Sequence, residues 1–373
     1  MGLLEGLNPS QKEAVCTTEG PVLVVAGAGS GKTRVLTHRI AYLLEEKGVD
    51  PGSILAITFT NKAAGEMKER LQALVGPASR WLWVSTFHAA CVRILRQEIA
   101  PLGYRSNFVI YDTADQLSLL KSCLKGLDLD DKKFPPKSIL HAISNAKNRL
   151  WGPERLAREA DNLFLDKAAE VYRRYQIRLK ELNGLDFDDL LMLTVELFRQ
   201  HDKVLRYYQH KFRYILVDEY QDTNHAQYVL IRQLASEHRN LCVVGDPDQS
   251  IYGWRGANLQ NILNFEEDYP EARVIKLEQN YRSTKIILTA ANQVISYNSD
   301  RKPKALWTEN PQGKPLLMVT GETEHHEAGF VAGEIYRQTQ GAGRSYKDFA
   351  VLYRTNAQSR VFEEAFIRSG IPY

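Results

Sequence analysis

Five short runs of apolar residues recur along the chain and predict the strands of a buried sheet. The runs are unbroken rather than alternating, which is typical of strands covered on both faces. Stretches with helical periodicity separate several of them, so the pattern favours a parallel sheet with crossover helices. The runs cover residues 22–26, 54–59, 214–217, 241–244 and 274–277.

The region 107–184 departs from this pattern and is mostly helical in its periodicity, with breakers at 134–136 (FPP) and 152–153 (GP). We interpret it as a helical insertion within the sheet domain. Between residues 132 and 158 it has seven Lys and Arg residues against one acid, Glu154. This imbalance predicts a basic face that touches nucleic acid, although an ordinary solvated helix face explains any single charge there.

A second α/β segment is expected after residue 278, with strands at 316–319 and 349–353. Two or three strands are too few for a stable parallel sheet. The segment is therefore expected either to lean on the first domain or to belong to a fragment. The predicted organisation is a sheet domain over 1–106 and 185–278, an insertion over 107–184, and the second segment over 279–373.

Composition narrows the class of protein. The 373 residues are 44% hydrophobic and 25% charged, which is ordinary for a globular chain with room for two or three domains. The net charge of +3 means that nucleic-acid binding would need a local groove. No apolar run is long enough to span a membrane, and the N-terminal residues show no secretory signal. The four scattered cysteines fit neither a disulfide framework nor a zinc site, which indicates a reducing cytoplasm.

Residues 26–33, AGAGSGKT, follow a predicted strand and open a predicted helix. Glycines allow backbone N–H groups to curl around phosphates, and the helix N-terminus adds the positive end of its dipole. Lys32 supplies a charge for the β- and γ-phosphates, and the Thr33 hydroxyl is a ligand for Mg²⁺. Ala26 stands where the stricter pattern has glycine. The segment predicts a nucleotide-phosphate site.

Residues 217–222, VDEYQD, follow the predicted strand 214–217. Asp218, at the strand end, is placed to hold Mg²⁺. Glu219 is then placed to orient or deprotonate an attacking water. An acidic helix-capping turn is the structural alternative. Together with the phosphate loop, this motif predicts a site that hydrolyses a nucleotide.

Residues 245–257, GDPDQSIYGWRGA, follow the predicted strand 241–244. Ligands collect at the carboxyl ends of strands in α/β sheets. The stretch combines carboxylates and the Gln249 amide with the rings of Tyr252 and Trp254 and the cation of Arg255. It suggests a loop that joins nucleotide chemistry to nucleic-acid binding, with a polar loop around buried aromatics as the alternative.

These segments and their order resemble the N-terminal half of a superfamily 1 DNA helicase of the UvrD/Rep/PcrA type, over essentially the whole chain. The resemblance implies an α/β fold: a RecA-like P-loop NTPase domain with a parallel sheet and a helical insertion, followed by the beginning of a second RecA-like domain. The matching motifs are LNPSQ from Leu7, AGAGSGKT from Ala26, TFTNKAA from Thr58, STFH from Ser85, DFDDLL from Asp186, VDEYQD from Val217, GDPDQSIYGWRGA from Gly245 and QNYRS from Gln279.

The resemblance implies roles at an ATP and Mg²⁺ site. Gln11 would read the adenine edge, while Arg34 and Tyr281 would sandwich the ring. Gln249 would sense the γ-phosphate, and Arg282 would act as an arginine finger from the second domain. The implied ATP-binding residues are Gln11, Ala28, Gly29, Ser30, Gly31, Lys32, Thr33, Arg34 and Tyr281; the metal ligands are Thr33 and Asp218; and the catalytic residues are Glu219, Lys32, Gln249 and Arg282.

The resemblance also implies contacts to single-stranded DNA, because aromatic rings stack on bases of any sequence. Phe59 and Phe87 follow apolar residues and could instead belong to the core. His88 could be a structural histidine, and Arg255 could reach towards Glu219 and the γ-phosphate rather than DNA. The implied DNA-binding residues are Phe59, Asn61, Thr86, Phe87, His88, Tyr252 and Trp254.

The expected activity is that of an ATP-dependent 3′–5′ DNA helicase acting on single strands and single-strand/duplex junctions, in repair or replication. The family's later motifs are not found before residue 373, so we expect a fragment that binds nucleotide weakly and does not unwind DNA. Two alternatives stay open: a helicase–nuclease subunit of the recombination type, and a non-motor module that binds ATP and docks on DNA.

Overall fold

The computed structural model describes residues 2–298, 302 and 304–373. They form two compact units, Met1–Gln312 and Gly313–Tyr373. Among the described residues, no helix is both long and apolar enough to cross a membrane.

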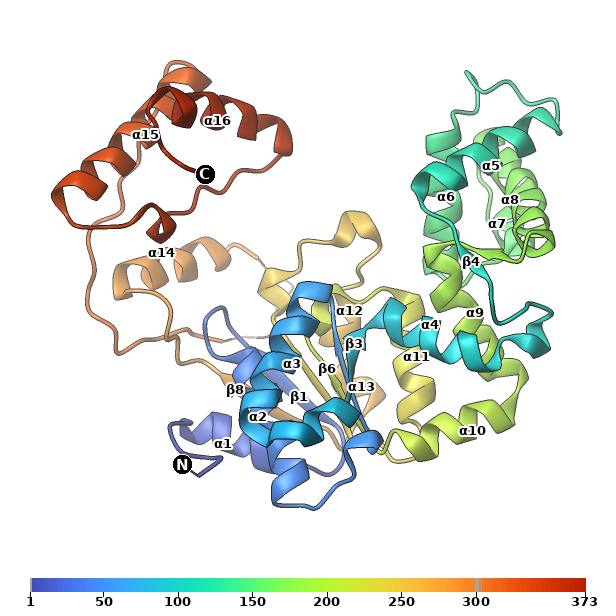
Figure 1. The fold of residues 1–373 in the computed structure, drawn as a ribbon, viewed down its shortest axis with the longest axis horizontal. Helices are drawn as coiled ribbons and strands as arrows, with labels where there is room; N and C mark the ends of the chain where they lie inside the picture. The colour runs from blue at the N-terminus through green and yellow to red at the C-terminus, as the bar shows by residue number, and fades with distance from the viewer. Residues whose placement is uncertain (1, 299–301, 303) are drawn as a thin grey trace. The chain divides into compact units, whose positions relative to one another are not determined.

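A parallel sheet organises the first unit, as the unbroken apolar runs predicted. In the described part of the chain its six strands lie in the order β3-β2-β6-β7-β1-β8 (Figure 1). The strand β3 was not among the predicted runs, because two of its four residues are Ser85 and Thr86. The strands are β1 (Val22–Ala26), β2 (Ile54–Thr58), β3 (Trp83–Thr86), β6 (Tyr214–Val217), β7 (Leu241–Gly245) and β8 (Arg273–Leu277).

Both faces of the sheet are covered, which explains why its strands do not alternate. In β1, Leu23 and Val25 pack into one core, whereas Val24 and Ala26 pack into the other. Helices α1, α2 and α3 cover the second core, and α4, α9 and α11 cover the first (Figure 1). The helices of this part are α1 (Pro9–Cys16), α2 (Lys32–Glu45), α3 (Asn61–Val75), α4 (Phe87–Glu98), α9 (Phe187–Gln200), α10 (Asp202–Lys211), α11 (His225–Ala235), α12 (Gln260–Leu263), α13 (Phe265–Asp268) and α14 (Lys285–Ile295).

The expected helical insertion is present and has a core of its own. Its first and last residues pair as two short parallel strands, β4 (Val109–Ile110) and β5 (Gly184–Leu185), so the chain leaves and returns side by side. Two of the predicted breakers, Pro136 and Pro153, are the first residues of helices, where a missing N–H costs nothing. The helices are α5 (Thr113–Lys125), α6 (Pro136–Asn148), α7 (Pro153–Arg158) and α8 (Leu163–Glu181).

Lys147 belongs to the basic stretch that the sequence suggested for a surface, yet it is only 1% exposed. Its Nζ donates to Asp186 Oδ2 and Asp189 Oδ1, both at 2.7 Å. Burial alone would lower the pKa of Lys147, but the charges of the two carboxylates raise it well above its usual value. Because Asp186 and Asp189 form the capping box of α9, this ion cluster fastens the insertion to the sheet domain.

The second unit consists of α15 (Glu324–Gly341) and α16 (Ser359–Arg368), which share a small apolar cluster with the loops between them. The predicted strands at 316–319 and 349–353 are wrong: the structure has neither. A strand needs a hydrogen-bonded neighbour, and the described residues of this unit supply none. Leu317, Met318 and Leu352 are exposed, whereas Phe349 and Val351 pack against the apolar cluster without forming a strand.

Candidate functional site

The phosphate loop joins β1 to α2 at the carboxyl edge of the sheet. Gly29 and Gly31 have φ values of +68° and +92°, a region that favours glycine. A Cβ on Gly31 would lie 2.8 Å from Gln11 Nε2, so a larger residue would have to displace the Gln11 amide. The first amides of α2 have no acceptor within the helix and point their dipoles outward, which makes this end a seat for an anion.

Two acidic side chains leave β6 directly beside this loop. Glu219 has a left-handed φ of +50°, and its N–H donates to Asp218 Oδ1 at 3.0 Å. This sharp turn takes the chain out of the sheet so that both carboxylates face the loop. Lys32 Nζ donates to Glu219 Oε2 at 2.8 Å and to Gln249 Oε1 at 3.5 Å. Three residues far apart in sequence thus meet at one point.

Asp218 is buried and its charge is poorly compensated. Burial and then the charge of Glu219 raise the pKa of Asp218 to about 7, against a smaller opposing effect of Lys32. A buried carboxylate at a strand end, with the Thr33 hydroxyl in the first turn of α2, offers the oxygen ligands that Mg²⁺ prefers. These residues therefore fit the implied metal.

Asp218→Asn is expected to stabilise the nucleotide-free, metal-free protein at pH 8 by about 2–4 kcal/mol, because one pKa unit corresponds to about 1.4 kcal/mol. The folded pKa lies above the unfolded value, so the wild type binds its proton more tightly when folded and loses stability as pH rises from about 4 to 7. Urea unfolding at pH 8 and pH 5 tests this: the gain at pH 5 should be less than half of the gain at pH 8. An equal gain at both pH values would contradict the raised pKa.

The implied adenine residues lie on the outer side of the phosphate loop. Gln11 Nε2 donates to Ser30 O at 2.9 Å, and Gln11 Oε1 accepts from Asn8 N at 3.1 Å. The Gln11 amide therefore already braces the loop and caps α1. Asn8 Nδ2 donates to the hydroxyl of Tyr281 at 2.8 Å. Arg34 also lies near Gln11, since a Cβ on Gly31 would be 3.8 Å from Arg34 Cβ and 2.8 Å from Gln11 Nε2.

The segment 280–282 lies against the same loop. Asn280 Nδ2 donates to Ala28 O at 2.6 Å, and Tyr281 N donates to Gly29 O at 2.9 Å. The Cβ of Arg282 would be only 2.7 Å from a Cβ on Gly29. The predicted arginine finger therefore starts next to the loop that it is expected to serve. The Ser30 hydroxyl, by contrast, donates to Gly27 O and holds the loop together.

An aromatic cleft of about 420 Å³ lies beyond this site. The rings of Phe59 and Tyr252 stack with their centroids 6.5 Å apart, and Trp254 is 64% exposed. The Arg255 guanidinium lies 4.5 Å from the Trp254 ring centroid rather than on Glu219. Of the predicted DNA residues, Phe59, Phe87, His88, Tyr252 and Trp254 line the cleft.

The structural alternatives apply to some of these residues. Phe87 is 2% exposed and belongs to the first core as well as to the cleft wall. Burial lowers the pKa of His88, which favours a neutral ring. Thr86 Oγ1 caps α4 by accepting from Ala89 N, and neither Thr86 nor Asn61 is among the residues lining the cleft.

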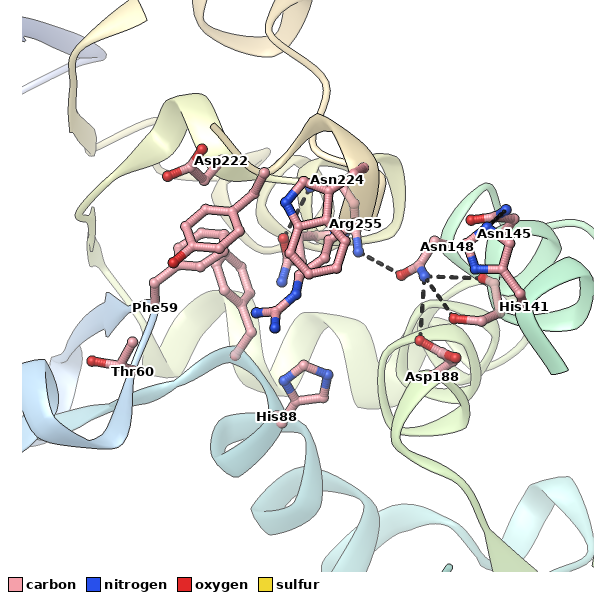
Figure 2. A pocket seen from close by; sticks show the side chains of 15 residues that line it. Phe59, Thr60, His88, His141, Asn145, Asn148, Asp188, Asp222, Asn224 and Arg255 are labelled. Carbon is pink, nitrogen blue, oxygen red and sulfur yellow. Dashed lines mark hydrogen bonds between the residues drawn. The ribbon is translucent and has the colours of Figure 1, made fainter. Parts of the chain in front are cut away.

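The opposite wall of the cleft was missed by the sequence reasoning. Figure 2 shows His141, Asn145 and Asn148 facing Phe59 and Thr60 across the cleft. The three polar residues lie four and three positions apart on α6, so they share one helix face. This spacing was a usable signal. Polar side chains of the insertion, rather than its Lys and Arg residues, line the cleft here. The other polar lining residues include Ser144, Asp188, Asn224 and Gln227.

Comparison with known proteins agrees with these features. The UvrD/REP helicase N-terminal domain matches residues 7–270, and the UvrD-like helicase C-terminal domain matches residues 275–373. The chain is 58% identical over 371 residues to ATP-dependent DNA helicase PcrA of Bacillus subtilis (strain 168), covering 100% of this chain and 50% of that protein. It is also 58% identical to PcrA of Staphylococcus aureus (strain Mu50 / ATCC 700699), covering 100% of this chain and 51% of that protein. The chain spans about half the length of the curated relatives it matches. With its P-loop domain, parallel sheet and helical insertion, the chain belongs to the UvrD/REP helicase family.

Proposed function

We propose that this protein acts as an ATP-dependent DNA helicase that moves 3′ to 5′ on single-stranded DNA, engages single-strand/duplex junctions and serves repair or replication. One observation supports the coupling of hydrolysis to movement more than any other. The loop 245–257 places Gln249 beside Lys32 in the phosphate site and, a few residues later, Tyr252 and Trp254 in the cleft. Because the loop is short, a displacement of Gln249 at the phosphate site is expected to displace Tyr252 and Trp254 in the cleft.

In the proposed reaction, the amides of the phosphate loop and Lys32 bind the phosphates of ATP. Lys32 must then exchange its bond to Glu219 for a phosphate oxygen, which frees Glu219 to orient and deprotonate the attacking water. Gln249 and Arg282 are proposed to contact the γ-phosphate, and Gln11, Arg34 and Tyr281 to hold the adenosine part. Mg²⁺, held by Thr33 and Asp218, would neutralise charge developing on the phosphates.

The aromatic cleft is proposed to hold the single strand through base stacking. Tyr252→Ala and Trp254→Ala are each expected to weaken oligo(dT) binding by about 1–3 kcal/mol, which is about 5–150-fold. Fluorescence anisotropy with labelled oligo(dT) measures the change. Trp81→Ala is the matched control, since Trp81 is exposed and is not among the residues lining the cleft. Equal affinities for all three variants would place the strand elsewhere.

ATP hydrolysis with and without oligo(dT) distinguishes the proposed motor from a non-motor docking module. A motor is expected to hydrolyse ATP faster when the cleft is filled, whereas a docking module would respond little. A helicase–nuclease subunit would show the same stimulated hydrolysis and would also cut the DNA in the same reactions.

The four cysteines are free thiols, which supports the proposal that the protein works in a reducing cytoplasm.

A further inference from the structure

Gln221 is a buried glutamine between the phosphate site and the cleft. It lies in the 3-10 turn Tyr220–Asp222 after β6 and is 1% exposed. Its Nε2 donates to Glu219 Oε2 at 3.0 Å and to Asp222 Oδ2 at 3.3 Å, while its Oε1 accepts from Asp246 N at 3.0 Å. Both N–H groups and the oxygen of this amide are therefore in use.

These three bonds lead to three different parts of the machinery. Glu219 is the carboxylate that pairs with Lys32. Asp222 lines the cleft, on the same side as Phe59 and Thr60 (Figure 2). Asp246 opens the loop that carries Gln249 and Tyr252. A single side chain thus touches the hydrolytic carboxylate, the cleft wall and the loop between them.

The surroundings leave the Gln221 amide little freedom. A Cβ on Gly245 would lie 2.6 Å from Gln221 Oε1 and 2.7 Å from Ile262 Cδ1. The amide oxygen therefore occupies the space that a side chain at position 245 would fill, and its bond from Asp246 N holds it there. Because the oxygen is held in this way, movement of either carboxylate acts on the Nε2 bonds.

The Asp222 carboxylate, which joins these hydrogen bonds to the cleft, has an oxygen that can accept a further hydrogen bond. Asp222 Oδ1 is buried and has no hydrogen bond of ordinary geometry within the described residues. Burial, and then the charge of Glu219, raise the pKa of this carboxyl to about 6, against a smaller opposing effect of the Ile251 backbone amide. A buried acceptor without a full partner costs free energy. A donor group on a bound nucleic-acid strand would relieve that cost and shift the Asp222 carboxylate.

We propose that Gln221 is a positioning residue that transmits occupancy of the cleft, through Asp222, to Glu219. The inference rests on the proposed function. When a bound DNA strand donates a hydrogen bond to Asp222, the bond from Gln221 Nε2 to Glu219 changes. The Glu219 carboxylate is then released towards the water that it must orient. Displacements of about 1 Å in such groups change rates by about 10²-fold.

The test compares wild type, Gln221→Leu and Gln221→Glu, with Gln209→Leu as the matched control. Gln209 is also a buried glutamine, and its Nε2 donates to Gln233 O and Ser236 Oγ, both at 2.7 Å, in the α10–α11 contact. ATP hydrolysis is measured with and without saturating oligo(dT). Affinity for a fluorescent ATP analogue is measured under the same two conditions, because this readout needs no turnover.

Both Gln221 variants are expected to lose the acceleration by oligo(dT) about 10- to 100-fold. ATP-analogue affinity measured without DNA, and oligo(dT) affinity measured without nucleotide, should stay within about twofold of wild type. The ratio of ATP-analogue affinities with and without oligo(dT) should fall towards one in both Gln221 variants. Gln209→Leu should keep the wild-type ratio and the wild-type acceleration by oligo(dT). If basal and stimulated rates fall together, or the variants match wild type, the transmission role is overturned. If oligo(dT) changes the ATP-analogue affinity of the wild type but the wild type does not hydrolyse ATP, the proposed function is refuted and the inference about Gln221 is not. A wild type with no linkage at all would overturn the inference.

Discussion

Replacing Glu219 by glutamine is expected to abolish ATP turnover while leaving nucleotide affinity intact or tighter. The amide cannot accept a proton from water, so kcat should fall by about 10²–10⁴-fold. Affinity survives because Glu219 competes with the phosphates for Lys32, whose Nζ is 2.8 Å from Glu219 Oε2. Removing the negative charge weakens that competition. Steady-state hydrolysis and binding of a fluorescent nucleotide measure the two effects separately.

Glu278→Gln is a suitable control for Glu219→Gln. Glu278 also follows the end of a strand in this sheet, β8, but its Oε1 accepts from Ala305 N rather than from the phosphate-loop lysine. Its turnover should stay close to that of wild type. If Glu219→Gln hydrolyses ATP at the wild-type rate, another group activates the water and the assignment of Glu219 fails.

Lys147→Met is expected to cost about 3–5 kcal/mol of unfolding free energy, the largest loss from any single side chain discussed above. The methionine fills a similar volume, but Asp186 and Asp189 are left buried without their cation. Burial and the charge of Asp186 already raise the pKa of Asp189. Because the folded state then binds protons more tightly than the unfolded chain, the deficit should shrink as pH falls from 8 to 5. Urea unfolding at both pH values measures it.

Two further variants serve as controls for the Lys147→Met experiment. Lys167→Met removes an exposed helix pair with Glu170 and should cost no more than about 0.5 kcal/mol. Adding Asp189→Asn to Lys147→Met should restore part of the loss by removing one uncompensated carboxylate. A loss below about 1 kcal/mol in Lys147→Met would mean that the cluster contributes little to joining the insertion to α9.

The sequence by itself determined the fold class and the phosphate site. Unbroken apolar runs can be stable only when both faces of a sheet are covered, so they predicted β1, β2, β6, β7 and β8. The phosphate loop is equally local, because the glycine conformations, Lys32 and the helix start are all encoded within eight residues. The failed strands at 316–319 and 349–353 mark the limit of this reasoning: apolar content alone does not provide a hydrogen-bonded neighbour.

Only the tertiary structure decided which side chains meet. The sequence suggested a basic face on the insertion, but the fold buries one of its seven basic residues, Lys147, on two carboxylates. It also presents His141, Asn145 and Asn148 to the cleft. Gln221 lies within the VDEYQD motif, but the motif indicated no role for it, because its proposed role depends on bonds to Glu219, Asp222 and Asp246. Periodicity and motifs predict the local backbone structure of a segment. Contacts between segments depend on packing, which brings together residues that no sequence spacing connects.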